Sequence, residues 1–89
     1  QWELAEADFT EAIRTNPNDV ENYTCRAEVL LQLHEYEAAL DDLTTALKLD
    51  NKADVADLMM QLMEEAPDAS MIDRVYATYN MLDKQELAN

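Results

Sequence analysis

The sequence of 89 residues contains no glycine and only two prolines, Pro17 and Pro67. Without glycine it cannot form the glycine-rich loop that cradles phosphates in nucleotide-binding proteins. Alanine, leucine, glutamate, glutamine and methionine are abundant instead, and these residues favour helices joined by short connections over hairpins. We therefore predict an all-α fold, and the length fits one small domain.

Basic residues are also scarce, since six lysines and arginines stand against twenty acidic residues and give a formal net charge of −14 at pH 7. Such a chain repels phosphate backbones and anionic membrane surfaces, so we expect no nucleic acid and no membrane among its partners. We find no apolar run long enough to span a bilayer and expect no signal peptide. The acidity indicates either a basic protein partner or only a need for solubility, and solubility is the simpler interpretation.

Cys25 is the only cysteine, which excludes an intramolecular disulfide and favours a reducing compartment. On this basis we expect a cytoplasmic protein. The chain does not begin with methionine, so Gln1 is expected to be the cut end of a longer protein.

Apolar residues at helical spacing divide the chain into five segments. Asn18 or Asp19 is the expected N-cap of the second segment, and the fourth must stop before Pro67, because a residue that precedes proline is pushed out of helical geometry. Ser70 and Asp73 resemble a capping arrangement for the fifth segment. We expect helices over about 2–15, 19–33, 36–50, 54–66 and 70–84.

The first and third segments share a pattern at a separation of thirty-four residues. In the third segment, Ala39 and Ala46 fall on one helix face with Leu43 between them, so another helix should pack closely against that face. The matched positions are Trp2 and Tyr36, Glu3 and Glu37, Ala5 and Ala39, Asp8 and Asp42, Phe9 and Leu43, Thr10 and Thr44, Ala12 and Ala46, and Ile13 and Leu47.

A two-helix repeat of this length is typical of the tetratricopeptide repeat, and the chain resembles that family at its defining positions. The resemblance is strongest over residues 20–53, although Asn51 stands where the family usually has proline; Pro17 supplies that proline one period earlier. The resemblance implies an antiparallel helix-turn-helix array. The signature residues are Tyr23, Ala27 and Leu30 in the first helix of the repeat, and Tyr36, Ala39, Leu43 and Ala46 in the second.

The repeat frame also predicts how a single domain over residues 1–89 is divided. Residues 1–19 match the second helix of a partial repeat, and residues 20–53 form a complete repeat. Beyond that the frame fails, because it would place Asp57 at the aromatic position and Gln61 at the small position. Either the register slips near Lys52 or residues 54–89 are a divergent helical cap, and we expect the cap because terminal repeats are atypical.

At the other end, the helix over residues 2–15 lacks the first helix that a complete repeat would provide. Its apolar face, with Trp2, would be half open. We interpret this as truncation or as pairing with another chain, so the expected partners include an oligomer or a larger parent chain that contacts the N-terminal helix.

The resemblance further implies a ligand groove on the concave surface that the first helices line. By position, its residues here are Glu21, Thr24, Cys25, Glu28, Leu31 and Gln32. The simpler interpretation of the charged and amide side chains among them is that they are merely solvated.

Residues 22–42 most resemble the co-chaperone members of the family, which hold the C-terminal carboxylates of heat-shock chaperones with lysine, asparagine and arginine side chains. That clamp is not intact here. Cys25 stands where the asparagine would be, and residues 54–66 contain no lysine or arginine. An acidic groove would repel an acidic chaperone tail, so we do not expect that ligand.

Catalytic and metal-binding patterns find little support in the sequence. His34 has no second histidine or paired thiol to act with, and the acidic run over residues 50–57 lacks the glycine and the terminal glutamate of a calcium loop. We therefore expect no catalytic residue, no metal, no cofactor and no enzymatic activity.

The five methionines all lie in the last third of the chain. We expect them mainly to fill the core, with Met60 and Met81 the least buried; the alternative is a binding face that adapts to varied partners. The fifth helix either packs on the fourth or lies in the groove as an internal ligand.

Two functions follow from these patterns. The first is a protein-protein interaction module, a scaffold or adaptor that binds a peptide or protein through its concave helix face. The alternative is a structural segment of a larger solenoid or oligomer that has no ligand of its own.

Overall fold

The computed structural model of the chain describes the backbone of residues 1–50, 53–66 and 68–88, and the side chains of residues 1–50, 55–66 and 68–80. No strand occurs in these parts of the chain, so the all-α prediction with five helices is confirmed. The helices are α1 (Trp2–Thr15), α2 (Val20–Gln32), α3 (Tyr36–Leu49), α4 (Ala53–Glu65) and α5 (Ala69–Ala88).

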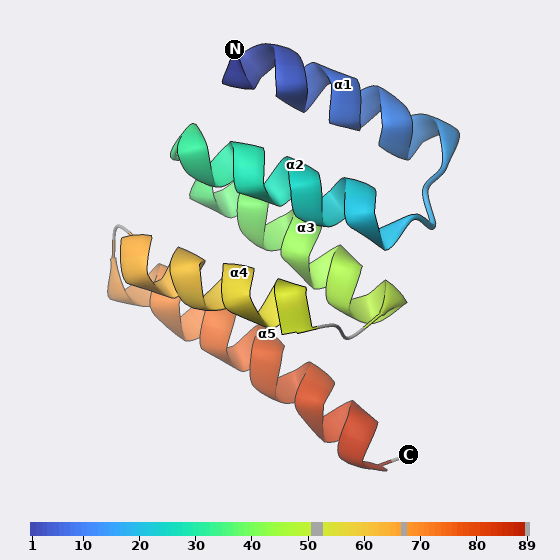
Figure 1. Cartoon of the computed structure of the whole chain (residues 1–89). Helices are drawn as coiled ribbons and strands as arrows, with labels where there is room; N and C mark the ends of the chain where they lie inside the picture. The colour runs from blue at the N-terminus through green and yellow to red at the C-terminus, as the bar shows by residue number, and fades with distance from the viewer. Residues whose placement is uncertain (51–52, 67, 89) are drawn as a thin grey trace.

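The helices follow one another from α1 at one end of the molecule to α5 at the other (Figure 1). α2 and α3 form a hairpin, and α4 and α5 form the next one. The two hairpins stack through contacts of α2 and α3 with α4 and of α3 with α5, while α1 packs on α2. This is the helix-turn-helix array that the repeat predicts.

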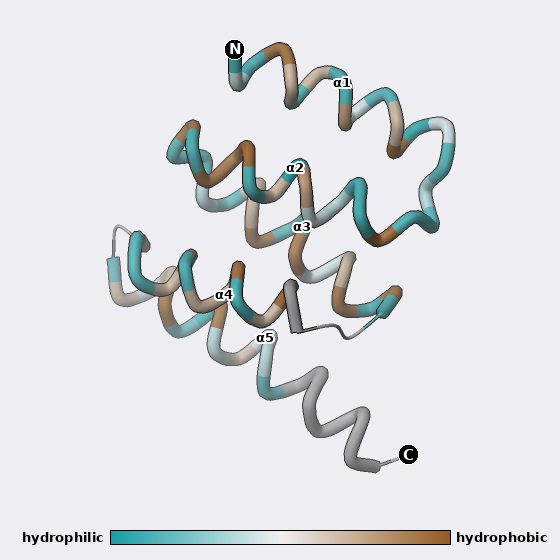
Figure 2. The backbone as a smooth tube through the Cα atoms, viewed as in Figure 1, coloured by the Kyte–Doolittle hydropathy of each residue, from teal (hydrophilic) through white to brown (hydrophobic). Residues whose placement is uncertain are grey.

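Each described helix carries hydrophobic and hydrophilic residues in alternation around its axis (Figure 2), as amphipathic helices do when one face is buried. Ala27 on α2 and Ala39 and Ala46 on α3 are all fully buried, and the larger Leu43 between the two α3 alanines is buried as well. The small side chains therefore let α2 and α3 pack closely, as their spacing predicts.

A buried ion pair joins the two helices of this hairpin. The Arg26 guanidinium on α2 donates from Nε and Nη2 to the two carboxylate oxygens of Asp42 on α3, at 2.7 and 2.6 Å. The Nη1 atom of the same group donates to Thr10 Oγ1 on α1 at 3.2 Å. Asp42 is the one buried charged residue among the described side chains, and this bidentate partner satisfies it.

α2 begins at a cap that the sequence predicts, since the Asp19 carboxylate accepts a hydrogen bond from the backbone N–H of Glu21 at 3.1 Å. The connection before it is fixed by Tyr23, whose hydroxyl donates to the Pro17 carbonyl at 2.8 Å. The aromatic signature residue of the repeat thus holds the preceding turn in addition to packing against the core.

α2 is followed, after Leu33, by a residue in the left-handed region, His34, with φ of 62°. The N–H of Glu35 then donates to the Leu30 carbonyl and the N–H of His34 to the Leu31 carbonyl, at 2.9 and 3.1 Å. This is the hydrogen-bond pattern of a Schellman motif, which usually places glycine at the left-handed position. Because the chain has no glycine, histidine takes that position here.

α4 and α5 repeat the burial pattern of the preceding hairpin with a shift of two residues. Positions thirty-two residues after Tyr23, Ala27, Leu30, Ala39 and Leu43 are all buried, whereas the thirty-four-residue frame would point to the exposed Asp57. We therefore interpret this segment as a further hairpin after a register slip, the alternative that the sequence analysis did not favour. The five buried residues are Val55, Met59, Leu62, Met71 and Val75.

The burial of the methionines and the residue that caps α5 were also predicted from the sequence. Met59 and Met71 lie in the core and Met60 is exposed, as predicted, while Met81 lies outside the described side chains. α5 is capped by Asp68, which accepts from the Met71 N–H at 2.8 Å, rather than by the predicted Ser70. The cap is earlier because the helix already begins at residue 69.

Candidate protein-binding groove

α2 and α4 lie side by side and leave a groove of about 490 Å³ between them. We call it the acidic groove, because three carboxylates line it and no lysine or arginine occurs among the described residues of its lining. Thr24 and Cys25 form the part of its wall that lies between the two glutamates of α2. Its residues are Glu21, Thr24, Cys25 and Glu28 from α2, and Asp57 and Leu58 from α4.

A second hollow of about 350 Å³ adjoins the acidic groove, and we call it the aromatic hollow. The two share Cys25, Glu28 and Leu58, so they form one continuous surface that extends from α4 across α2 to α1. The aromatic hollow is lined by Trp2, Ala5 and Phe9 from α1, by Cys25, Glu28, Val29 and Gln32 from α2, and by Leu58 and Gln61 from α4.

Five of the six residues that the sequence assigns to the groove line this surface; Leu31 does not. Its side chain is 1 % exposed and belongs to the central core cluster, so its assignment to the groove was wrong. The physical reason is the face it occupies: Leu31 follows Leu30 and Ala27 on the side of α2 that packs inward.

The structure adds residues that the sequence did not assign to the surface. Trp2 and Phe9 enter because α1 packs on α2. Asp57 and Gln61 enter from α4, where the register slip turns both of them out of the core positions that the repeat frame would give them. The sequence offered one signal for this: Asp57 and Gln61 are polar, and polar side chains seldom occupy the buried positions that the repeat frame would give them.

The negative charges of the acidic groove affect the pKa of the Cys25 thiol. Burial raises the pKa of Cys25 above its ordinary value, and the negative charges of Glu28, Glu21 and Asp19 raise it further. The thiolate is disfavoured, as expected for an acidic setting, and Cys25 is therefore a poor nucleophile. A cation that enters the groove would experience the same field as an attraction.

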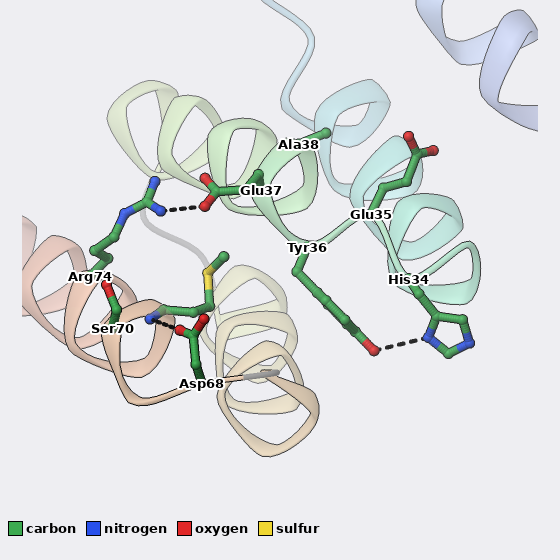
Figure 3. A pocket seen from close by; sticks show the side chains of 9 residues that line it. His34, Glu35, Tyr36, Glu37, Ala38, Asp68, Ser70 and Arg74 are labelled. Atoms are coloured by element: carbon green, nitrogen blue, oxygen red, sulfur yellow. Dashed lines mark hydrogen bonds and ion pairs between the residues drawn. The ribbon is translucent and has the colours of Figure 1, made fainter.

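A separate hollow of about 460 Å³ lies between the start of α3 and the start of α5 (Figure 3). Two of its charged groups pair with each other: Arg74 donates to Glu37, which raises the pKa of the arginine and lowers that of the glutamate. At its other side His34 Nδ1 lies 2.9 Å from the Tyr36 hydroxyl. The Arg74–Glu37 pair ties the second hairpin to the first.

Met60 lines a fourth, mostly apolar hollow of about 330 Å³ between α4 and α5. Tyr76 and Tyr79 stand at its edge with 58 and 42 % of their surface exposed, beside Met60. If the methionines form a binding face that adapts to varied partners, this hollow is the place for it. α5 packs on α3 and α4, and none of its described side chains lines the acidic groove, so the structure supports packing on α4 rather than an internal ligand.

Comparison with known proteins bears on the family of this array. The sequence profile of the tetratricopeptide repeat matches residues 9–41, which cover the second half of α1, all of α2 and the start of α3. Over these residues the chain is similar to the tetratricopeptide repeat family. The match confirms the resemblance for the signature residues up to Ala39, and the five helices confirm the fold class.

A curated relative is the translocon at the outer membrane of chloroplasts 64 of Pisum sativum. It is 40 % identical over 52 residues, which cover 58 % of this chain and 9 % of the relative. The chain thus spans less than a tenth of that relative's length. No solved structure matches the chain significantly.

The described residues also bear on metal binding and on the crossing of a membrane. No group of three or more histidine, cysteine, aspartate or glutamate side chains among them is arranged to hold a metal ion. Likewise, within those residues, no helix combines the length and the apolar character that crossing a membrane requires.

Proposed function

We propose that this chain is a protein-interaction module, a scaffold or adaptor without enzymatic activity, that binds a peptide or protein segment in the acidic groove. The tetratricopeptide match supports protein binding in general, because repeats of this family mediate protein-protein interaction. The relative in Pisum sativum carries the name of a translocon, and a role within an assembly of proteins fits an adaptor.

The ligand we propose carries lysine or arginine side chains. The observation behind this choice is that Glu21, Glu28 and Asp57 line the groove, and that no cationic side chain accompanies them among the described residues. Carboxylates in a partly enclosed site attract cationic side chains and can accept their hydrogen bonds. The same three groups would repel a carboxylate terminus, and Cys25 offers no amide donor, so we propose that the chaperone clamp is not intact.

The groove can be tested with a displayed library of random peptides selected on the immobilised chain at physiological salt. We expect the selected peptides to be enriched in lysine and arginine. The best peptide is then measured against a variant with Glu21→Lys and Glu28→Lys. Its dissociation constant should rise about tenfold or more, which corresponds to about 1.4 kcal/mol or more of binding free energy.

The matched control reverses two exposed carboxylates that do not line the groove, with Asp41→Lys and Glu64→Lys. This variant changes the net charge by the same amount. If both variants lose affinity equally, the bulk charge explains the binding and the groove has no special role. If the groove variant binds as well as the original chain, the proposal is wrong. Circular dichroism of both variants establishes that they fold.

A structural role within a larger solenoid or oligomer is the second candidate, and the open face of α1 favours it. Trp2 is 49 % exposed and α1 has no buried residue. In that case sedimentation would show association that depends on concentration and disappears on Trp2→Asp. For either function we propose a cytoplasmic site of action, with no cofactor and with neither nucleic acid nor membrane as partner, because of the net charge and the single cysteine.

A further inference from the structure

The four methionines whose side chains the structure describes differ sharply in exposure. Met59 and Met71 are only 1 and 4 % exposed and belong to the central core cluster. Met63 is half-buried against that core, whereas Met60 leaves 61 % of its surface in solvent. Of these four thioethers, that of Met60 is therefore the one that small solutes reach most readily in the folded chain.

Met60 lies at a junction of two surface features. It lines the mostly apolar hollow between α4 and α5, together with Tyr76 and Tyr79. On α4 it follows Asp57 by three residues, so it lies on the same side of the helix as that carboxylate of the acidic groove. Met60 is not a member of the core cluster, and the packing of the helices does not depend on its side chain.

The repeat indicates that this position stays accessible inside an array. In the shifted frame, the residue that corresponds to Met60 is Glu28 on α2, thirty-two positions earlier. Glu28 is exposed although α4 packs against α2. A further helix packed against α4 in the same way would therefore leave Met60 exposed as well.

Cys25 is the other sulfur that an oxidant could attack, and its surroundings disfavour the reaction. The thiolate, not the thiol, is the reactive form of cysteine. Cys25 is only partly exposed, and burial together with the negative charges of Glu28, Glu21 and Asp19 raises its pKa. A thioether has no proton to lose, so the reactivity of a methionine depends on access to its sulfur and not on such charges.

We propose that Met60 is a reversible oxidation site, with a hydroperoxide as the oxidant. The sulfur lone pair attacks the terminal oxygen of the hydroperoxide, so that an S–O bond forms while the O–O bond breaks. The proton of the transferred oxygen passes to the leaving oxygen, which departs as water or as an alcohol. Sulfur loses two electrons and the peroxide gains them. A dithiol-dependent methionine sulfoxide reductase reverses the step: two thiols supply two electrons and two protons, the oxygen leaves as water, and the thiols form a disulfide.

The sulfoxide changes the surface and leaves the fold in place. Its S–O group is polar and must remain hydrated, so the end of the Met60 side chain can no longer take part in an apolar contact. The hollow between α4 and α5 becomes more polar, while the core cluster is untouched. The proposal does not depend on the peptide ligand of the acidic groove.

Selectivity is tested by treating the whole chain with hydrogen peroxide at pH 7. Peptide mass spectrometry with fragmentation, which separates the adjacent Met59 and Met60, follows each methionine and Cys25. We expect Met60 to be oxidised about tenfold or more faster than Met59 and Met71, because the two buried residues react only when the fold opens. In urea the three rates should become equal.

The effect of the modification is tested on the chain oxidised at Met60 alone. We expect it to elute earlier from a phenyl column in hydrophobic-interaction chromatography, and its Tm to fall by less than about 3 °C, as for a surface change. A methionine sulfoxide reductase with dithiothreitol should restore the original retention. The matched controls are Met60→Leu, which should keep its retention on brief exposure to peroxide, and Met59→Leu, which should still show the shift.

Each contrary outcome overturns the proposal. Equal rates for Met60 and the two buried methionines in the folded chain would show that exposure does not select the site. Oxidation of Cys25 before Met60 would assign the reaction to the thiol instead. A larger fall in Tm would mean that Met60 supports the fold, and unchanged retention would mean that it is not part of the apolar surface. Failure of the reductase would contradict reversibility. Affinity for lysine-rich peptides is measured separately with Glu21→Lys and Glu28→Lys, and its loss would leave these results unaffected.

Discussion

The Arg26 guanidinium and the Asp42 carboxylate form a bidentate ion pair across the interface of α2 and α3, with N–O distances of 2.7 and 2.6 Å. The side chain of Asp42 is only 6 % exposed and that of Arg26 22 %. A buried pair of this kind need not add stability compared with a well-packed apolar pair, but it becomes essential once both charges are enclosed.

Removal of the arginine should therefore cost more than removal of the pair. We expect Arg26→Ala to lower the free energy of unfolding by about 3 kcal/mol, because it leaves the Asp42 charge buried without a partner. The double variant Arg26→Met with Asp42→Leu should lose much less, since it removes both charges and keeps the volume. Urea denaturation of the three proteins measures this difference, and equal losses for the single and the double variant would contradict it.

Enlarging a signature alanine should have opposite consequences in the two copies of the repeat. Ala39→Leu places a larger apolar side chain between the closely packed α2 and α3, and it should destabilise the fold by about 1–3 kcal/mol. Ala5→Leu, at the equivalent position of the open α1 face, should change stability by less than about 0.5 kcal/mol. Thermal unfolding of the two variants side by side is the measurement, and similar losses would mean that the α1 face is closed in solution.

The left-handed conformation of His34 makes this position sensitive to branching at Cβ. We expect His34→Val to destabilise the chain by about 1–2 kcal/mol, because a β-branched residue is strongly disfavoured at positive φ. His34→Asn should be tolerated better, since asparagine adopts this conformation more readily. Chemical denaturation compares them. A valine variant as stable as the asparagine variant would show that the turn has another conformation.

The raised pKa of Cys25 predicts slow alkylation of the folded chain. Near pH 8.5, about the ordinary pKa of a thiol, the native thiol should react with iodoacetamide more slowly than the same thiol in urea, because less of it is thiolate. Glu28→Gln should raise the native rate by removing a nearby negative charge. Since folding favours the protonated thiol, its contribution to stability is full below the unfolded pKa and is lost as the pH rises through the folded pKa. A native rate equal to the unfolded rate would contradict the assignment.

Much of the first hairpin was predictable because its interactions repeat or are local. The thirty-four-residue match identified the close-packed alanines, and the polar residues after Pro17 limited the N-cap to Asn18 or Asp19, of which the structure uses Asp19. Five of the residues assigned to the groove line one surface for the same reason, since position in a regular helix determines which face a side chain occupies.

The failures have local causes that spacing does not reveal. Leu31 was assigned to the groove by its position in the family. Its apolar side chain instead packs with Leu30 in the core that α3 and α4 complete. The two-residue slip before α4 could not be predicted, because the residues that mark the register are methionine and valine, which suit many core positions. Sequence patterns identify left-handed turns mainly through glycine, so His34 gave no signal.

Arg26 contacts three helices at once, since it bonds to Asp42 on α3 while its remaining nitrogen reaches Thr10 on α1. In a linear array, each unit is stabilised mainly by its immediate neighbour, and unfolding can begin at an end. A local opening of α1 would therefore remove a hydrogen bond from the guanidinium and admit water to one side of the buried pair. Through this one side chain, fraying of the terminal helix is coupled to the stability of the central hairpin, so the two should unfold cooperatively.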